Sequence, residues 1–144
     1  MAEALGREMA RRGVRLVFGG GRVGLMGTVA DAVIAGGGTT AGIIPGHLFD
    51  REVGHTGLSE LHVVDSMHQR KQMMFDLSDA FAILPGGTGT LDEAFEILTW
   101  RQLGLHDKPI VLFDMENYWK PLRDLVKHFI AHGFADQSTY DLFT

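Results

Sequence analysis

The chain has 144 residues, of which 45% are hydrophobic and 22% charged, and its formal net charge is −5. It contains no cysteine, which excludes disulfides and thiolate metal sites, and no basic run that would neutralise nucleic-acid phosphates. Because no apolar run approaches the ~20 residues needed to cross a bilayer, we expect a cytoplasmic protein without membrane or nucleic-acid partners.

Helical patterns alternate with short apolar segments along the whole chain. In order, the sequence predicts helix 3–12, strand 14–18, helix 25–35, strand 40–44, loop 46–60, strand 61–64, helix 66–77, strand 80–84, helix 90–103, strand 109–113 and helix 118–132. Unbroken apolar strands between helices indicate a parallel sheet covered on both faces. We therefore expect an α/β fold, a Rossmann-like three-layer sandwich, forming a single nucleotide-binding domain over residues 1–144.

The two ends depart from this pattern. The chain opens directly on a helix, and it stops at Thr144, where another strand would be expected. A doubly wound sheet without these strands would have unpaired edges, so we expect a domain that is truncated at both ends.

Glycines are concentrated where the first predicted strand meets the next helix. Gly19, Gly21 and Gly24 follow a G-x-G-x-x-G pattern. We term residues 19–27 the first glycine turn. It would let backbone N–H groups approach a phosphate, although a closely packed strand-to-helix crossover would also require glycine. No acidic residue ends the next strand, at Ile44, as a dinucleotide site requires, so a smaller phosphate-bearing ligand fits better.

A second glycine turn, residues 85–90 with the sequence PGGTGT, joins a buried strand to a helix. Its glycines and threonine hydroxyls place hydrogen-bond donors at a helix N-terminus, where the dipole favours an anion. Two interpretations of Glu93 stay open: a catalytic carboxylate, or the second half of a Thr90-x-x-Glu93 capping box. Because ligands of open α/β sheets bind at the carboxyl ends of the strands, we expect both turns at that edge.

Two further side-chain pairs are candidates. Arg70 and Lys71 stand near a helix start, where positive charge opposes the dipole, so they have either a use beyond stability or the role of an ordinary solvated pair. His128 and His132 share a helix face, but no glutamate follows the first histidine as in H-E-x-x-H. Because histidines complement the dipole in the last turns of a helix, we expect no metal site there.

Three motifs together go beyond generic pattern: GGGRVGLMG at 19–27, MHQRK at 67–71 and PGGTGTLDE at 85–93. With them the chain closely resembles, from about Ala4 to Phe134, the Lonely Guy (LOG) family of cytokinin-activating phosphoribohydrolases, long labelled lysine decarboxylases. The resemblance implies a Rossmann-like homodimer that needs no cofactor. It also implies hydrolysis of the N-glycosidic bond in N6-modified adenosine 5′-monophosphates, giving the free base and ribose 5-phosphate.

The resemblance also implies residue roles. Arg70 and Glu93 align with the catalytic pair. The positions that align with substrate contacts, or that belong to the two glycine turns, are Gly20, Gly21, Glu52, Lys71, Gly86, Gly87, Thr88, Gly89, Thr90, Leu91, Asp92 and Thr99. The alternative function is a non-catalytic module that senses AMP-like ligands; retention of both Arg70 and Glu93 favours the enzyme.

Overall fold

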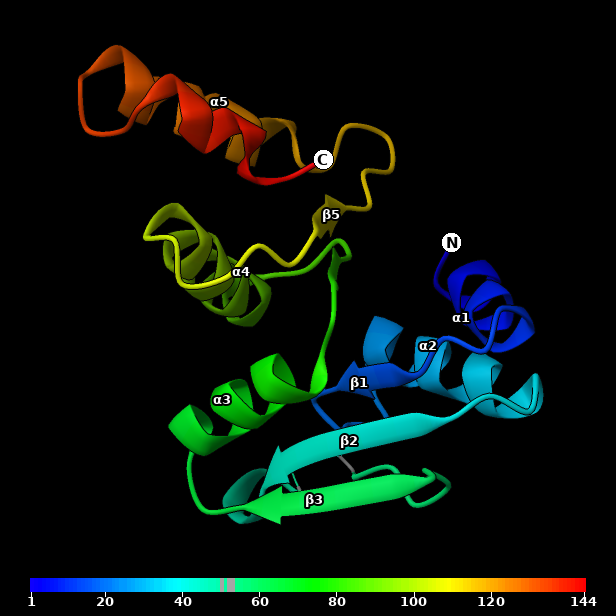
Figure 1. Cartoon of the computed structure of the whole chain (residues 1–144). Helices are drawn as coiled ribbons and strands as arrows, with labels where there is room; N and C mark the ends of the chain where they lie inside the picture. Colours follow the sequence, from blue (N-terminus) through cyan, green and yellow to red (C-terminus); the bar gives the residue numbers. More distant parts are fainter. Residues whose placement is uncertain (50, 52–53) are drawn as a thin grey trace. The chain divides into compact units, whose positions relative to one another are not determined.

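The computed structural model describes residues 1–49, 51 and 54–144, and these form two compact units, Met1–Ser78 and Asp79–Thr144. Figure 1 follows the chain through both units. None of the helices formed by the described residues is long and apolar enough to cross a membrane.

The first unit is built on a three-stranded parallel sheet of order β1-β2-β3, in which Phe18, Gly42 and Leu61 lie in register. Its elements are α1 (Ala2–Arg11), β1 (Leu16–Phe18), α2 (Gly24–Ala35), β2 (Thr40–Pro45), the 3-10 turn η1 (Gly46–Leu48), β3 (Glu60–Val64) and α3 (Met67–Leu77). Every residue of the central strand β2 is buried, which explains its unbroken apolar sequence.

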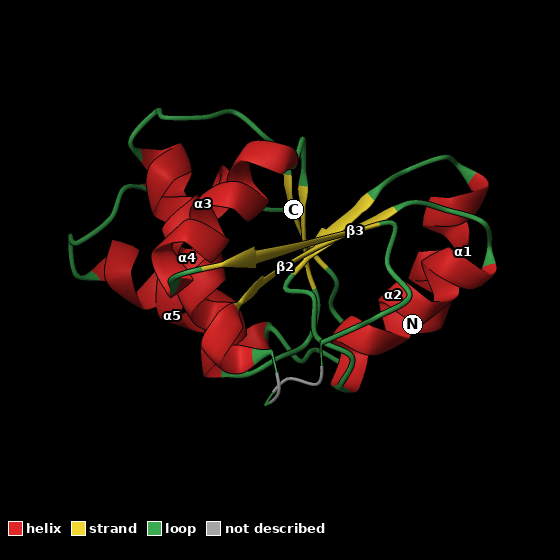
Figure 2. Ribbon diagram, turned by 90° about the horizontal axis from the view of Figure 1, so that it is seen from below, coloured by secondary structure: helices red, strands yellow, loops and turns green. Residues whose placement is uncertain are grey.

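Helices cover both faces of this sheet. Seen along the sheet in Figure 2, α1 and α2 lie on one side of the strands and α3 lies on the other. The helices α1 and α2 approach closely at Gly6, where an added Cβ would lie 2.6 Å from the carbonyl oxygen of Val29. The chain thus reverses direction across the sheet after β3, as in doubly wound folds.

The second unit contains two parallel strands, β4 (Phe81–Ile83) and β5 (Ile110–Leu112), with Ala82 opposite Val111. Its other elements are α4 (Thr88–Gln102), α5 (Lys120–Ala131) and the 3-10 segment η2 (Gln137–Leu142). Its core combines Ile110, Trp119 and Val126 with other buried apolar side chains. Thr144 hydrogen-bonds to β5: its N–H donates to the carbonyl oxygen of Ile110, and its own oxygen accepts from Leu112 N–H.

The order of helices and strands matches the sequence-based prediction, with three boundary corrections. The last helix begins at Lys120 and not at Tyr118, with Trp119 as its N-cap. The first strand begins at Leu16 and not at Val14, because Val14 N–H donates to the Met9 carbonyl and so completes the C-terminal cap of α1. Helix α4 begins at Thr88, two residues before the predicted start, with Gly87 as its N-cap. Within the predicted loop 46–60, the described residues form η1 and a bridge between Gly54 and Gly21.

Candidate functional site

The second glycine turn runs directly from β4 into α4. Gly87 is the N-cap, and the first helical bond runs from Leu91 N–H to the Gly87 carbonyl, 3.1 Å away. The amides of the first turn therefore have no acceptor within the helix, and the positive end of the dipole lies there. The exposed residues Gly87, Thr88 and Gly89 thus offer a site suited to an anion.

Packing explains only one of the three glycines in this turn. A Cβ added at Gly86 would lie 2.1 Å from Thr90 Oγ1, so the turn requires glycine there. A Cβ added at Gly87 or Gly89 would meet no atom within 4 Å among the described residues. Glycine at these two positions keeps the helix N-terminus accessible to a ligand. No contact with the described residues requires glycine there.

The start of α4 differs from the predicted capping box. Since α4 begins at Thr88 with Gly87 as its N-cap, Thr90 lies inside the first turn and Glu93 in the second. The interpretation of Thr90 and Glu93 as a capping box with Thr90 at the N-cap is therefore wrong. The half-buried carboxylate of Glu93 follows Gly89 and Thr90 by four and three residues, which places it on their face of the helix.

Arg70, in α3, is buried, with only 5% of its surface exposed. Its Nη2 donates to the Gly19 carbonyl at 2.7 Å, and its Nε donates to the Ile43 carbonyl at 3.1 Å. A Cβ at Gly19 would lie 2.2 Å from Nη2, so glycine makes room for the guanidinium. The interpretation of Arg70 and Lys71 as an ordinary solvated pair is wrong for Arg70, which ties the end of β1 to β2; Lys71 is half-buried.

The first glycine turn is explained largely by packing. Gly20 has a φ of +74°, and a Cβ at Gly27 would lie 1.9 Å from the Arg22 carbonyl oxygen. Gly20 and Gly21 are both buried, Gly20 accepting from His55 N–H at 2.9 Å. Close packing therefore accounts for Gly20 and Gly27, whereas a Cβ at Gly24 would meet no described atom within 4 Å, and a substrate contact by Gly20 or Gly21 stays a prediction.

His55 is a buried residue that sequence patterns did not identify. Its Nδ1 accepts from Gly57 N–H at 3.1 Å, and its Nε2 lies 2.8 Å from Asp31 Oδ1. The His55 ring thus ties the segment after Gly54 to Asp31 of α2, while the His55 backbone N–H ties it to Gly20. No sequence signal reveals the pair, because its members stand 24 residues apart in different elements.

The other predicted positions are distributed as follows. Leu91, Asp92 and Thr99 line a shallow hollow on α4 together with Phe95 and Trp100, among others. Glu52 lies outside the described residues. Of the residues proposed for the site, Gly20, Gly21, Arg70 and Lys71 belong to the first unit, whereas residues 86–93 and Thr99 belong to the second.

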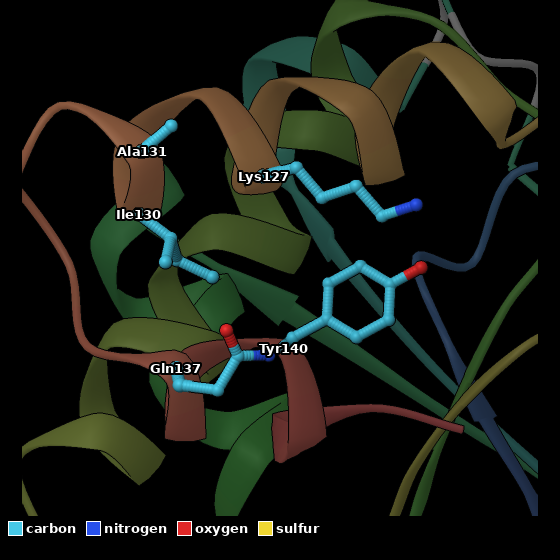
Figure 3. A pocket seen from close by; sticks show the side chains of 5 residues that line it. All are labelled: Lys127, Ile130, Ala131, Gln137 and Tyr140. Atoms are coloured by element: carbon cyan, nitrogen blue, oxygen red, sulfur yellow. The ribbon is translucent and has the colours of Figure 1, made fainter.

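A second hollow contains none of the predicted site residues. It lies between α5 and η2, where Lys127 and Tyr140 face one another (Figure 3). Nearby, His132 Nδ1 lies 2.9 Å from the His128 carbonyl oxygen at the end of α5. Among the described residues, no group of three or more histidine, aspartate or glutamate side chains could hold a metal ion.

The parallel strands, the flanking helices and the glycine turns define a Rossmann-like α/β protein. A family model described as "Possible lysine decarboxylase" matches residues 26–144. The cytokinin riboside 5′-monophosphate phosphoribohydrolase of Rhodococcoides fascians is 51% identical over 140 residues, which are 96% of this chain and 71% of that protein. The enzyme of the same name from Arabidopsis thaliana is 45% identical over 130 residues, 90% of this chain and 61% of its own length. The chain therefore belongs to the LOG family of cytokinin riboside 5′-monophosphate phosphoribohydrolases.

Solved structures share the fold. The molybdenum cofactor carrier protein of Chlamydomonas reinhardtii aligns with 87% of this chain and 72% of its own, with a TM-score of 0.68 and 25% identity. The molybdenum cofactor binding protein of Rippkaea orientalis aligns with a TM-score of 0.65 and 23% identity, covering 88% of this chain and 73% of its own. The predicted Rossmann-like α/β class is confirmed.

Proposed function

We propose that the chain hydrolyses the N-glycosidic bond of N6-modified adenosine 5′-monophosphates, releasing the free base and ribose 5-phosphate. Water adds its hydroxyl to C1′ of the ribose, and the base leaves with a proton. The observation that carries the proposal is the helix N-terminus at Gly87 and Gly89, where an added Cβ would meet no described atom within 4 Å, with the carboxylate of Glu93 one turn further along α4.

In this proposal the 5′-phosphate binds at the start of α4. The amides of Gly87 to Thr90 donate to its oxygens, and the helix dipole favours its charge. The hydroxyls of Thr88 and Thr90 add donors of the same kind. Gly86, Leu91, Asp92 and Thr99 are proposed as further substrate contacts of this unit, and Gly20, Gly21, Glu52 and Lys71 as those of the other.

The chemical step develops positive, oxocarbenium-like charge on the ribose as the bond to the base lengthens. We assign Glu93 to stabilise that charge or to activate the attacking water, because a fixed carboxylate acts most strongly where charge develops. Arg70 is assigned to orient the nucleotide. Its two bonds to backbone carbonyls hold the guanidinium in place before substrate binds, which lowers the cost of positioning.

A nucleotide-binding module without catalysis is the second candidate, and one observation favours it. Arg70 supports the fold by bonding to Gly19 and Ile43, so its presence does not by itself require a reaction. The distinction between the two functions therefore depends on Glu93. A binding module has no need of its carboxylate charge, whereas the hydrolase does.

The test replaces the Glu93 carboxylate by an amide of the same shape. Glu93→Gln should lower kcat about 100-fold or more, because removing one charge that acts in the transition state costs that much. Glu3→Gln makes the same chemical change at an exposed position of α1 and should leave the rate unchanged. Turnover is measured by chromatography of free base from isopentenyladenosine 5′-monophosphate and from AMP. Wild-type turnover in Glu93→Gln would contradict the assignment.

We also propose that the chain acts as a single domain and works in the cytoplasm, as its length, element pattern and composition lead us to expect, and that it assembles as a homodimer, as the family resemblance implies. Light scattering coupled to size exclusion measures the assembly directly. A mass of one chain across a range of protein concentrations would contradict the dimer.

A further inference from the structure

Tyr118, in the segment between β5 and α5, reaches back to the second glycine turn. Its hydroxyl donates to the Gly86 carbonyl oxygen at 2.8 Å, across 32 residues of sequence. The side chain is half-exposed, with 49% of its surface accessible. This bond ties the segment before α5 directly to the start of α4.

The bond constrains the peptide unit that joins Gly86 to Gly87. In a trans peptide the carbonyl of one residue and the N–H of the next point in opposite directions, and every described peptide bond is trans. Fixing the Gly86 carbonyl toward Tyr118 therefore fixes the Gly87 N–H on the opposite side. Two adjacent glycines would otherwise let this unit rotate, since an added Cβ at Gly87 meets no described atom within 4 Å.

Tyr118 is itself held by the residues around it. The next residue, Trp119, is buried in the core, and its N–H donates to Asp114 Oδ1 at 3.1 Å. The other oxygen of Asp114 lies 2.5 Å from Arg123 Nη2. These bonds lower the pKa of the Asp114 carboxyl, first through the Trp119 N–H and then through Arg123, so the carboxylate stays charged. The backbone next to Tyr118 is therefore held in place, and the phenol hydroxyl bonds to Gly86 from this fixed position.

The backbone of the segment is consistent with this role. Glu116 and Asn117 both have positive φ angles, 53° and 61°, an uncommon conformation for residues other than glycine. The Tyr118 ring also packs edge-on against Trp119, with 5.0 Å between the ring centroids. The strained turn and the buried tryptophan together direct the phenol away from the core and toward the turn.

We propose that Tyr118 is a positioning residue for the phosphate: its hydroxyl holds the Gly86–Gly87 peptide so that Gly87 N–H faces the 5′-phosphate. This inference rests on the proposed function for the identity of the anion. A merely structural tie would stabilise the fold and affect all ligands alike. A residue that positions the phosphate site should change the affinity only for ligands that carry a phosphate.

The test uses the full chain and removes one oxygen atom. Tyr118→Phe deletes the hydroxyl and keeps the half-exposed ring, and Tyr140→Phe makes the same change at the only other tyrosine. Tyr140 lies in the hollow near Lys127, with 5.4 Å from Nζ to its ring centroid, and belongs to no proposed site. Calorimetry gives the Kd of AMP and of adenosine for each protein, and steady-state kinetics give kcat and KM.

Tyr118→Phe should weaken AMP binding about 3- to 10-fold, the size of one lost hydrogen bond, and raise KM more than it lowers kcat. Adenosine binding should match wild type, and Tyr140→Phe should match wild type with both ligands. Equal losses for AMP and adenosine, or no loss for AMP, would overturn the inference. If wild-type protein binds AMP but releases no base, the proposed function fails, and the AMP affinities still decide the role of Tyr118. A wild-type protein that binds neither AMP nor ribose 5-phosphate would overturn both.

Discussion

At the scale of single residues, the burial of Arg70 has the largest structural consequence. Guanidinium groups are rarely buried without partners, because removing the charge from water is costly. Here the carbonyls of Gly19 and Ile43 accept from it, and the glycine makes room for it. Arg70 therefore serves the fold of the first unit as well as the proposed reaction.

Replacing Arg70 by alanine should lower the free energy of unfolding by about 3 kcal/mol, because two backbone carbonyls lose a charged donor and a cavity remains. Urea unfolding followed by circular dichroism measures this change. Arg7→Ala serves as control: it removes an exposed ion pair with Glu3, and we expect a change within about 0.5 kcal/mol. If both variants unfold at the same urea concentration, the structural role of Arg70 is refuted.

The sequence indicates which side chains are candidates for the site, but it does not indicate which atoms those side chains contact. Arg70 and Glu93 lie in the motifs MHQRK and PGGTGTLDE, and their catalytic roles are implied by the family resemblance that these motifs carry. The partners of Arg70 could not be found in this way, since Gly19 and Ile43 are 51 and 27 residues away and offer only backbone atoms. The contact of Tyr118 could not be predicted for the same reason. Its partner is the backbone carbonyl of Gly86, and any residue type would supply such a carbonyl.

At the scale of elements, the starts of α3 and α4 differ in how they are capped. Ser66 is the N-cap of α3, and its Oγ accepts from Gln69 N–H at 3.2 Å. The Gln69 amide oxygen accepts from Asp65 N–H, one residue before the position expected for a capping box. Helix α4 instead begins after a glycine, without any side-chain cap.

This difference predicts unequal effects for two matched substitutions. Ser66→Ala should lower the free energy of unfolding by about 1 kcal/mol, the usual cost of losing an N-cap. Thr90→Ala should cost less than about 0.5 kcal/mol, because Thr90 lies inside its helix and caps nothing. Thermal and urea unfolding of both variants measure the comparison. A larger loss for Thr90→Ala would restore the capping-box interpretation of Glu93.

The free energy of unfolding should depend on pH through Asp114, which lies before α5. The pKa of Asp114 is lowered by the hydrogen bond from Trp119 N–H and by Arg123. A carboxyl whose pKa is lower in the folded state contributes stability above its unfolded pKa of about 3.9, and loses it as the pH falls through the folded value.

Asp114→Asn should therefore be less stable than wild type above about pH 5, and the difference should shrink as the pH falls below about 4. Urea unfolding between pH 2 and pH 7 measures both proteins, and the difference isolates Asp114. Glu8, whose pKa is lowered to about 2 by hydrogen bonds from Arg11 and Arg12, titrates in both proteins and cancels. A difference that does not change with pH would contradict the assignment.

Element boundaries show where sequence patterns lose information. Val14 has the residue type of a strand, yet its N–H completes the cap of α1 behind Gly13. Likewise, Thr90 has the residue type of an N-cap, yet α4 starts at Thr88. In both cases the boundary depends on the conformation of a glycine, Gly13 for α1 and Gly87 for α4. The sequence does not determine that conformation, because glycine adopts many backbone conformations.

At the scale of the whole molecule, the alternation of helices and strands was enough to predict the Rossmann-like α/β class. The parallel pairing of β1, β2 and β3, and of β4 with β5, confirms it. The described residues form two compact units, Met1–Ser78 and Asp79–Thr144. That the two units make up one domain stays a prediction. The chain spans 71% of the Rhodococcoides relative and 61% of the Arabidopsis relative, so activity has to be measured on this chain itself.

The most direct measurement incubates the wild-type chain with isopentenyladenosine 5′-monophosphate and, in parallel, with the riboside that lacks the phosphate. Free base and ribose 5-phosphate are then quantified by chromatography and mass spectrometry. We expect the two products in equal amounts from the monophosphate and far slower release of base from the riboside, because the proposed site at the start of α4 binds the 5′-phosphate, which the riboside lacks. Recovery of the monophosphate intact, or equal rates for both compounds, would contradict a phosphate-directed hydrolase.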